Sequence, residues 1–205
     1  MRRHVCFTLL SAVAANGLAN SFVPLDLGDY NFDYRNLAGA ASQFPVGANT
    51  LGGVDFLMPI SGGTGWASAN DADRILTLGG LNIAQADKVH VLVNTFWGST
   101  GRTATMTVKG DGGTVVTKTL YGGSDMRDYL FGAYTNTING TTTVNVFNAG
   151  SGYGNAVRFD MLTLDLGAEF QTENLVEVEF VDNGANGVSR MFTAGVTVEV
   201  VPEPG

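Results

Sequence analysis

The stretch TATMTVKGDGGTVVTKTL, residues 103–120, contains two segments in which apolar and polar residues alternate, with Gly and Asp between them. Alternation with a period of two is typical of a β-strand that buries one face, because successive side chains point to opposite sides. The Asp111-Gly112-Gly113 sequence between the segments favours a turn. We therefore predict two strands here, at 103–109 and 114–120.

The same pattern recurs along most of the chain. Other alternating segments lie at 88–97, 142–147, 157–166, 175–181 and 190–200, with weaker candidates at 22–27, 54–59 and 74–83. Gly, Asn and Asp separate them, and Asn139-Gly140 between Thr-rich runs suits a type I′ hairpin. No segment shows a sustained helical period. These features predict one all-β domain at 20–200, an antiparallel β-sandwich of the jelly-roll kind.

The first 19 residues differ from the rest of the chain. Arg2 and Arg3 precede an apolar run, and the small residues of Gly17-Leu18-Ala19 follow it. This layout is typical of a secretory signal peptide, and we expect cleavage after Ala19. The apolar run has about half the length needed to cross a bilayer. The alternative is that 1–19 forms the first apolar element of the domain.

Removal of that segment would change the chemistry of the chain. Cys6 is the only cysteine, so the mature chain would have no disulfide, no cysteine metal site and no thiol nucleophile. Loss of Arg2 and Arg3 leaves nine Lys and Arg against 19 Asp and Glu, a net charge of −10. A chain this acidic repels phosphate backbones, so nucleic acid is not an expected partner.

The sequence offers little for catalysis, and we do not predict an enzyme. His90 is the only histidine after the expected signal peptide, and it lies between two valines of a strand rather than in an evident Ser-His-Asp triad. Glu177 and Glu179 should share one face of a strand. Two carboxylates can hydrolyse glycosides, although adjacent acids on one face are more typical of a solvent-facing sheet. A glycoside hydrolase or polysaccharide lyase using paired carboxylates remains the alternative.

No cofactor is expected, and the metal content is left open. A single histidine and the absence of mature cysteine exclude the usual zinc sites. Residues 29–33, DYNFD, begin like a calcium-binding loop, but the rest of that motif is missing. A structural calcium held by scattered acids is an open alternative. Its candidate ligands are Asp71, Asp73, Asp111, Asp125, Asp128 and Asp182.

Aromatic residues in polar segments are the candidates for ligand contact. Trp66 stands in GGTGWASAND, Trp97 ends a strand at TFWGSTG, and Tyr121 and Tyr129 flank a Gly-rich run. An exposed ring can cover the C–H face of a sugar while polar neighbours bind its hydroxyls. The alternative is that these rings close the ends of the core, which the apolar neighbours of Trp97 favour.

A charged motif lies between the two tyrosines. Asp125, Arg127 and Asp128 form an Asp-x-Arg-Asp sequence, which places carboxylates within reach of a guanidinium group. Such a cluster can fix a turn or hold a sugar hydroxyl. We keep all three residues as binding candidates beside the aromatic ones.

Several stretches together resemble a jelly-roll, carbohydrate-binding-like domain of secreted bacterial proteins, of the galactose-binding-like kind. They are VPLDL at 23–27, TLGGVDFLMP at 50–59, VHVLVNTFWG at 89–98, GGSDMRDY at 122–129, VRFDML at 157–162 and RMFTAGVTV at 190–198. The resemblance covers 23–198 and implies the fold more directly than the function, because sandwich folds host many functions.

The terminal Val201-Pro202-Glu203-Pro204 resembles the motif of a PEP-CTERM sorting signal. In that system an anchor helix and a basic end follow the motif, and an exosortase processes it. Neither feature follows here, so we expect the start of a sorting motif at 201–205 without its anchor helix, and membrane anchoring only where such a helix is added. The resemblance implies export to the cell surface of a Gram-negative bacterium.

These observations favour a non-enzymatic exported protein of the cell surface or extracellular matrix. Its expected partners are an extracellular polysaccharide or glycan and an exosortase-type enzyme. A structural or adhesive module that binds protein, through strand addition at an open sheet edge, is a further alternative.

Overall fold

The computed structural model describes residues 20–27, 30–36, 43–58, 65–68, 74–132, 134–152, 155–184 and 189–202. The expected signal peptide, Asp71, Asp73, Glu203 and Pro204 lie outside these residues. Within this part of the chain, no helix is long and apolar enough to cross a membrane.

The described residues form strands joined by turns and two short 3₁₀ helices. The strands are β1 (Ser21–Leu25), β2 (Gly47–Leu51), β3 (Val54–Met58), β4 (Trp66–Ala67), β5 (Ile75–Ile83), β6 (Ala86–Phe96), β7 (Thr103–Gly110), β8 (Val115–Tyr121), β9 (Thr143–Gly152), β10 (Asn155–Asp165), β11 (Leu175–Asp182) and β12 (Arg190–Val200). The 3₁₀ helices are η1 (Tyr34–Asn36) and η2 (Ala168–Gln171).

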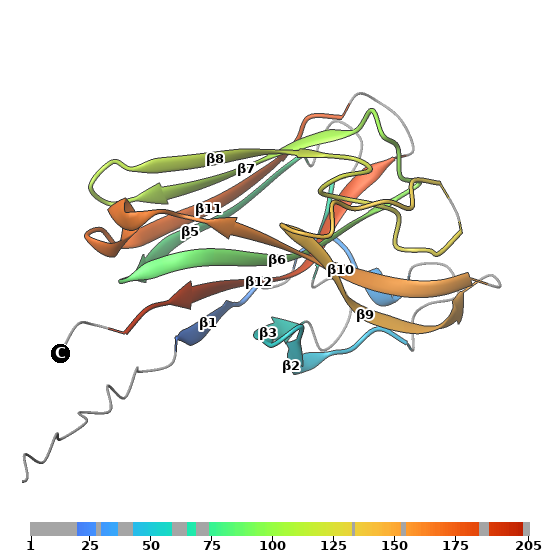
Figure 1. Ribbon diagram of the computed structural model, residues 1–205, viewed down its shortest axis with the longest axis horizontal. Helices are drawn as coiled ribbons and strands as arrows, with labels where there is room; N and C mark the ends of the chain where they lie inside the picture. The colour runs from blue at the N-terminus through green and yellow to red at the C-terminus, as the bar shows by residue number, and fades with distance from the viewer. Residues whose placement is uncertain are drawn as a thin grey trace, which may run out of the picture.

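The strands form two main sheets that pack face to face (Figure 1). The first sheet has the order β1-β12-β6-β10-β9, with β4 attached to β12, and the second has the order β5-β11-β7-β8. All paired strands are antiparallel. The chain passes repeatedly from one sheet to the other, which is the strand order of a jelly roll. The predicted antiparallel sandwich is therefore confirmed.

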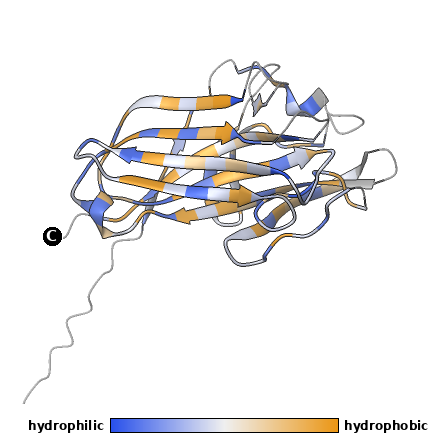
Figure 2. Ribbon diagram, turned by 90° about the horizontal axis from the view of Figure 1, so that it is seen from above, coloured by the Kyte–Doolittle hydropathy of each residue, from blue (hydrophilic) through white to orange (hydrophobic). Residues whose placement is uncertain are grey.

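The main core lies between the two sheets. Val91 of β6 and Leu162 of β10 contribute to it from the first sheet, and Met106 of β7 and Phe180 of β11 from the second, all fully buried. The alternation of apolar and polar residues that turns these side chains inward is visible along the strands in Figure 2. Burial of each such side chain contributes about 1.5–3 kcal/mol to the free energy of unfolding.

The first sheet is buried on its other face as well. The β2–β3 hairpin, which forms a small sheet of its own, packs there with Phe56 against Leu92 of β6 and Phe192 of β12 in a second apolar cluster. The hairpin approaches the sheet closely at Gly195, since a Cβ atom at this position would lie 3.1 Å from the Phe56 ring. The central strands β6 and β12 therefore carry apolar residues on both faces, which explains their nearly continuous apolar sequence.

Most of the predicted strands are confirmed, and two were missed. The strand β2 has the sequence GANTL, which lacks strong alternation, and β4 has only two residues. The predicted Asn139-Gly140 hairpin is wrong, because 135–142 is not a strand. Instead the Asn139 side-chain oxygen accepts hydrogen bonds from the backbone N–H groups of Thr141 and Thr143, at 2.8 and 3.0 Å.

Candidate functional site: the loop end of the sandwich

Two loops meet at one end of the sandwich, and we call them together the loop end. Residues 97–102 connect β6 to β7, and 122–142 connect β8 to β9. The second loop runs beside the end of β6, where Thr95 donates its N–H to the Arg127 carbonyl at 2.9 Å and accepts from Tyr129 N–H at 3.0 Å. The loops are therefore fastened to the central strand of the sandwich through backbone hydrogen bonds.

Asp128 joins the two loops. One oxygen of its buried carboxylate accepts the N–H of Gly98 at 2.9 Å, and the other accepts the N–H of Leu130 at 2.9 Å. Its own N–H donates to the Thr135 carbonyl at 2.9 Å. Burial raises the pKa of Asp128, and the hydrogen bonds from Gly98 and Leu130 oppose that rise. Asp128 was a candidate for ligand contact or for fixing a turn, and its carboxylate makes the contacts of the second kind, which hold the loops together.

Arg127 is paired with a residue of the sheet rather than with its neighbours in the motif. Its Nε and Nη2 atoms donate to the two oxygens of Asp160 in β10, each at 2.7 Å, and Nη1 donates to the Asn136 carbonyl at 3.0 Å. Asn94 also donates to the Asp160 carboxylate, at 2.9 Å. The expected grouping of Arg127 with Asp125 and Asp128 is therefore corrected, because Asp160 presents both its oxygens to the guanidinium edge.

A second arginine, Arg158, supports the same loop and lies against the ring of Phe131. Arg158 of β10 donates from Nε to the Asp128 carbonyl at 2.8 Å and from Nη2 to the Asn136 side chain at 2.7 Å. Its guanidinium lies 4.3 Å from the centre of the Phe131 ring, a cation–π contact. Burial, followed by the charge of Arg127, lowers the pKa of Arg158 to about 10.

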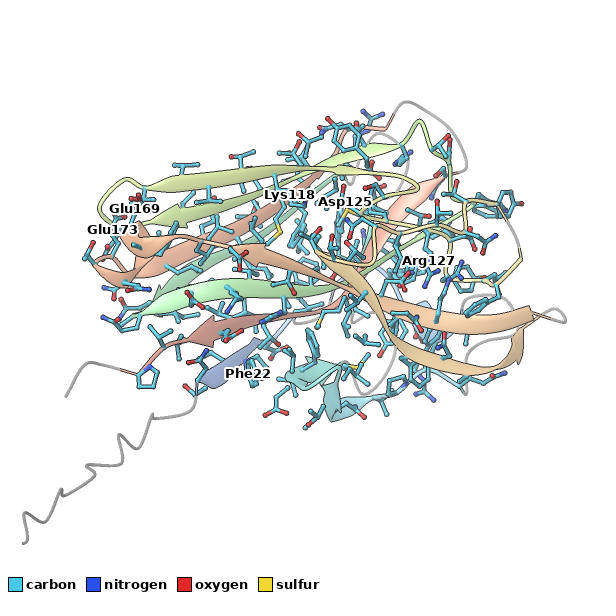
Figure 3. All side chains as sticks on the ribbon, in the orientation of Figure 1. Phe22, Lys118, Asp125, Arg127, Glu169 and Glu173 are labelled. Carbon is cyan, nitrogen blue, oxygen red and sulfur yellow. The ribbon has the colours of Figure 1, made fainter. Side chains whose placement is uncertain are left out.

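Asp125 fixes the start of the long loop. Its carboxylate accepts the N–H of Tyr121 at 3.0 Å and pairs with the Lys118 ammonium at 2.9 Å. Figure 3 shows Lys118 and Asp125 together where β8 leads into the loop. Asp125 is buried, so like Asp128 it fixes a turn, which is the structural alternative that the sequence left open.

Glycines allow the two loops to pack closely. A Cβ atom on Gly122 would lie 1.9 Å from the Ser99 carbonyl oxygen, and one on Gly98 would lie 3.0 Å from the Asp128 nitrogen. A side chain at position 122 would require the backbone to move, and one at position 98 would require its neighbours to shift. The Gly-rich sequence at 122–123 therefore serves loop contact, which makes the loop end a compact surface.

Aromatic rings stand exposed on this surface. The exposed fraction is 44% for Trp97, 37% for Phe131 and 61% for Tyr134, and Tyr121 at the end of β8 is 52% exposed. Trp97 and Tyr134 both have a left-handed backbone, with φ of 52° and 49°. For a bulky residue that conformation is strained, and such strain is concentrated at functional sites.

Two of the candidate binding residues are buried in the protein. Trp66 is 1% exposed, because β4 pairs with β12 and turns the indole into the main core. Tyr129 is 5% exposed and packs its ring against Phe44 and Phe192. The polar sequence around Trp66 suggested a solvent-facing loop, but the pairing with β12 outweighs it. Trp97, in contrast, is exposed although its apolar neighbours favoured burial.

The residues considered for catalysis lie elsewhere. His90 is buried in β6, where its ring nitrogens face Thr163 at 3.0 Å and Glu199 at 2.9 Å. Glu177 and Glu179 share the outer face of β11 as predicted, and Glu177 pairs with Lys109 at 2.6 Å. Among the described residues, no group of three or more His, Cys, Asp or Glu side chains is placed to hold a metal.

Two residues of β10 that hold the loop end were missed by the sequence analysis. Arg158 and Asp160 alternate within the apolar run VRFDML, and both are buried. Charged residues on a strand that is otherwise apolar are a usable signal, because such groups are buried only when paired. Their partners lie about 30 residues away in the chain, at sequence separations of 30 and 33, which no local pattern reveals.

Comparisons with known proteins give no relative for this arrangement. No protein-family model, no curated protein and no solved structure matches the chain.

Proposed function

We propose that this protein is a non-enzymatic, exported glycan-binding protein of the cell surface or extracellular matrix, and that the loop end is its binding surface. The observation that carries the proposal is the pair of exposed, strained aromatic residues Trp97 and Tyr134. Asp128 holds the backbone beside both of them, through Gly98 and Thr135. A strained backbone at an exposed residue costs stability without a packing gain, which supports a use for these side chains outside the fold.

The chemistry of the surface suits a sugar. Aromatic faces cover the C–H groups of a pyranose ring, and short polar side chains bind the hydroxyl groups. Ser99, Thr100 and Thr137 supply exposed hydroxyls on the same two loops. Because the loops are tied to β6 and β10, the backbone that carries the rings is held in place before a ligand arrives, which lowers the entropic cost of binding.

A glycan array tests the proposal. We expect the full chain to bind a subset of polysaccharides and Trp97→Ala to lose that binding. Val115→Ala is the matched control, since Val115 is an apolar residue 56% exposed at the far end of β8. Failure of the wild-type chain to bind any glycan, with and without calcium, would contradict the proposal.

We propose in addition that Val201 to Pro204 serve as an exosortase recognition motif in an exported protein. The Val201 N–H bonds to the Gln85 carbonyl at 3.0 Å, and Pro202 follows directly. Proline has no N–H to continue a strand ladder, so it favours an exit of the chain from the sheet at this point. Replacement of Pro202, Glu203 and Pro204 by Ala in the bacterial gene should abolish surface delivery in cell fractionation, and unchanged delivery would refute the motif.

A further inference from the structure

The exposed side chains of the loop end are neutral. Among the described residues of 97–102 and 122–142, every exposed position is an aromatic, hydroxyl, amide or glycine residue. The four charged residues of these loops are Arg102, Asp125, Arg127 and Asp128, and none of them is exposed. This composition is unusual on a chain with a formal net charge of −8.

Each of these four charged side chains pairs with, or accepts hydrogen bonds from, another group of the protein. Arg102 pairs with the buried carboxylate of Asp182, and Arg127 pairs with Asp160. Asp125 pairs with Lys118, and Asp128 accepts backbone N–H groups. The charge of Arg127 is already balanced by the buried Asp160 carboxylate, so its attraction for a ligand carboxylate is weakened.

Three acidic residues, Asp111, Glu169 and Glu173, lie at the opposite end of the sandwich. Glu169 and Glu173 lie there, far from Arg127, as Figure 3 shows. Asp111 and Glu169 are exposed at that end, and Glu173 bonds to the β7–β8 turn through the N–H of Gly112 at 3.0 Å. Their field adds a general repulsion toward polyanions and supplies no attraction at the loop end.

We infer that the ligand class of the loop end is an uncharged, hydroxyl-rich polysaccharide, not a uronate-containing or sulfated one. This inference rests on the proposed function. Stacking on Trp97 and Tyr134 needs no ligand charge, and hydroxyl groups find donors and acceptors in the serine, threonine and asparagine side chains of the loops. An anionic polymer would meet no exposed cation among the described residues of this surface.

Affinity electrophoresis of the full chain through gels containing one polysaccharide each tests the inference. The panel contains a neutral β-glucan, a neutral galactomannan, alginate and dextran sulfate, at low and at high salt. We expect retardation by a neutral polymer, little change with salt, and affinity for either anionic polymer at least about tenfold weaker. Retardation by alginate or dextran sulfate alone, or binding that falls steeply with salt, would overturn the inference and leave glycan binding standing.

A designed variant separates the alternatives further. Thr137→Lys places an ammonium group on the loop end at an exposed position. It should gain salt-sensitive binding to alginate that the wild type lacks, while the matched Thr119→Lys variant in β8 should not. If no polymer retards the wild-type chain, the proposed function fails, and this inference fails with it.

Discussion

The guanidinium of Arg127 and the carboxylate of Asp160 meet edge to edge, with Nε and Nη2 each 2.7 Å from a different carboxylate oxygen. Arg127 belongs to the β8–β9 loop and Asp160 to the central part of β10, and their side chains are 12% and 0% exposed. The pair therefore fastens the loop end to the sandwich, and its geometry requires a planar fork that lysine does not have.

Loss of one partner should destabilise the protein strongly. Asp160→Asn leaves the Arg127 charge buried without its counter-charge, and we expect the free energy of unfolding to fall by about 3–5 kcal/mol. Urea unfolding followed by circular dichroism measures the change. Lys109→Ala, which breaks the solvent-exposed pair with Glu177, is the control and should leave the midpoint nearly unchanged. Equal midpoints for wild type and Asp160→Asn would contradict the structural role.

The two tryptophans should respond oppositely to truncation. Trp66 is buried and Trp97 is 44% exposed, so Trp66→Ala should cost about 3–5 kcal/mol of stability, while Trp97→Ala should change it by less than about 1 kcal/mol. Thermal unfolding of the two variants side by side checks this. A large loss in Trp97→Ala together with a small loss in Trp66→Ala would exchange their assigned roles.

The left-handed backbone of Trp97 gives a prediction with an unusual sign. At φ of 52°, glycine avoids a steric cost of about 1–2 kcal/mol that alanine shares with tryptophan, so Trp97→Gly should be more stable than Trp97→Ala. In an ordinary strand position such as exposed Thr119 of β8, glycine should instead be less stable than alanine by about 0.5–1 kcal/mol. If alanine were more stable than glycine at position 97 as well as at position 119, the backbone of Trp97 would not be strained.

The lowered pKa of Glu199 predicts how the stability of the protein depends on pH. Burial acts to raise its pKa, but hydrogen bonds from Asn20 and His90 and the nearby charge of Lys88 outweigh burial, so the pKa lies below its usual 4.5. A carboxyl with a lowered folded-state pKa adds stability above pH 4.5, and that contribution is lost as pH falls through the folded value.

Glu199→Gln isolates this contribution. The difference in unfolding free energy between wild type and Glu199→Gln should be largest near neutral pH and shrink as the pH falls below 4.5. Chemical unfolding at several pH values measures it. A difference that stays constant, or grows in acid, would contradict the lowered pKa.

The sandwich could be predicted because the pattern that marks each strand lies within a short segment of the sequence. Alternation in segments such as TATMTVK and LVEVEFV follows from which face of a strand is buried, and each segment carries it independently. The strands that were missed, β2 and β4, lack that pattern, because the first has an incomplete core face and the second is positioned only by its pairing with β12.

The contacts of the loop end could be predicted only in part. The sequence indicated a polar loop with the Asp-x-Arg-Asp motif, but the partner of Arg127 is Asp160, whose position beside the loop depends on how β10 pairs with β6. Exposure of single rings was harder still. Trp97 is exposed although its flanking residues favoured burial, and Trp66, which the sequence left open, is buried, because burial is decided by neighbours distant in sequence.

The most direct test of glycan binding at the loop end uses Trp97 as its own reporter. Trp66→Phe leaves Trp97 as the only tryptophan, and its fluorescence is followed while a neutral polysaccharide is added, with and without acrylamide as a quencher. The proposed site predicts a blue shift, protection from quenching, and binding weakened about tenfold or more by Tyr134→Ala. Glycan binding that leaves the emission and quenching of Trp97 unchanged would contradict it.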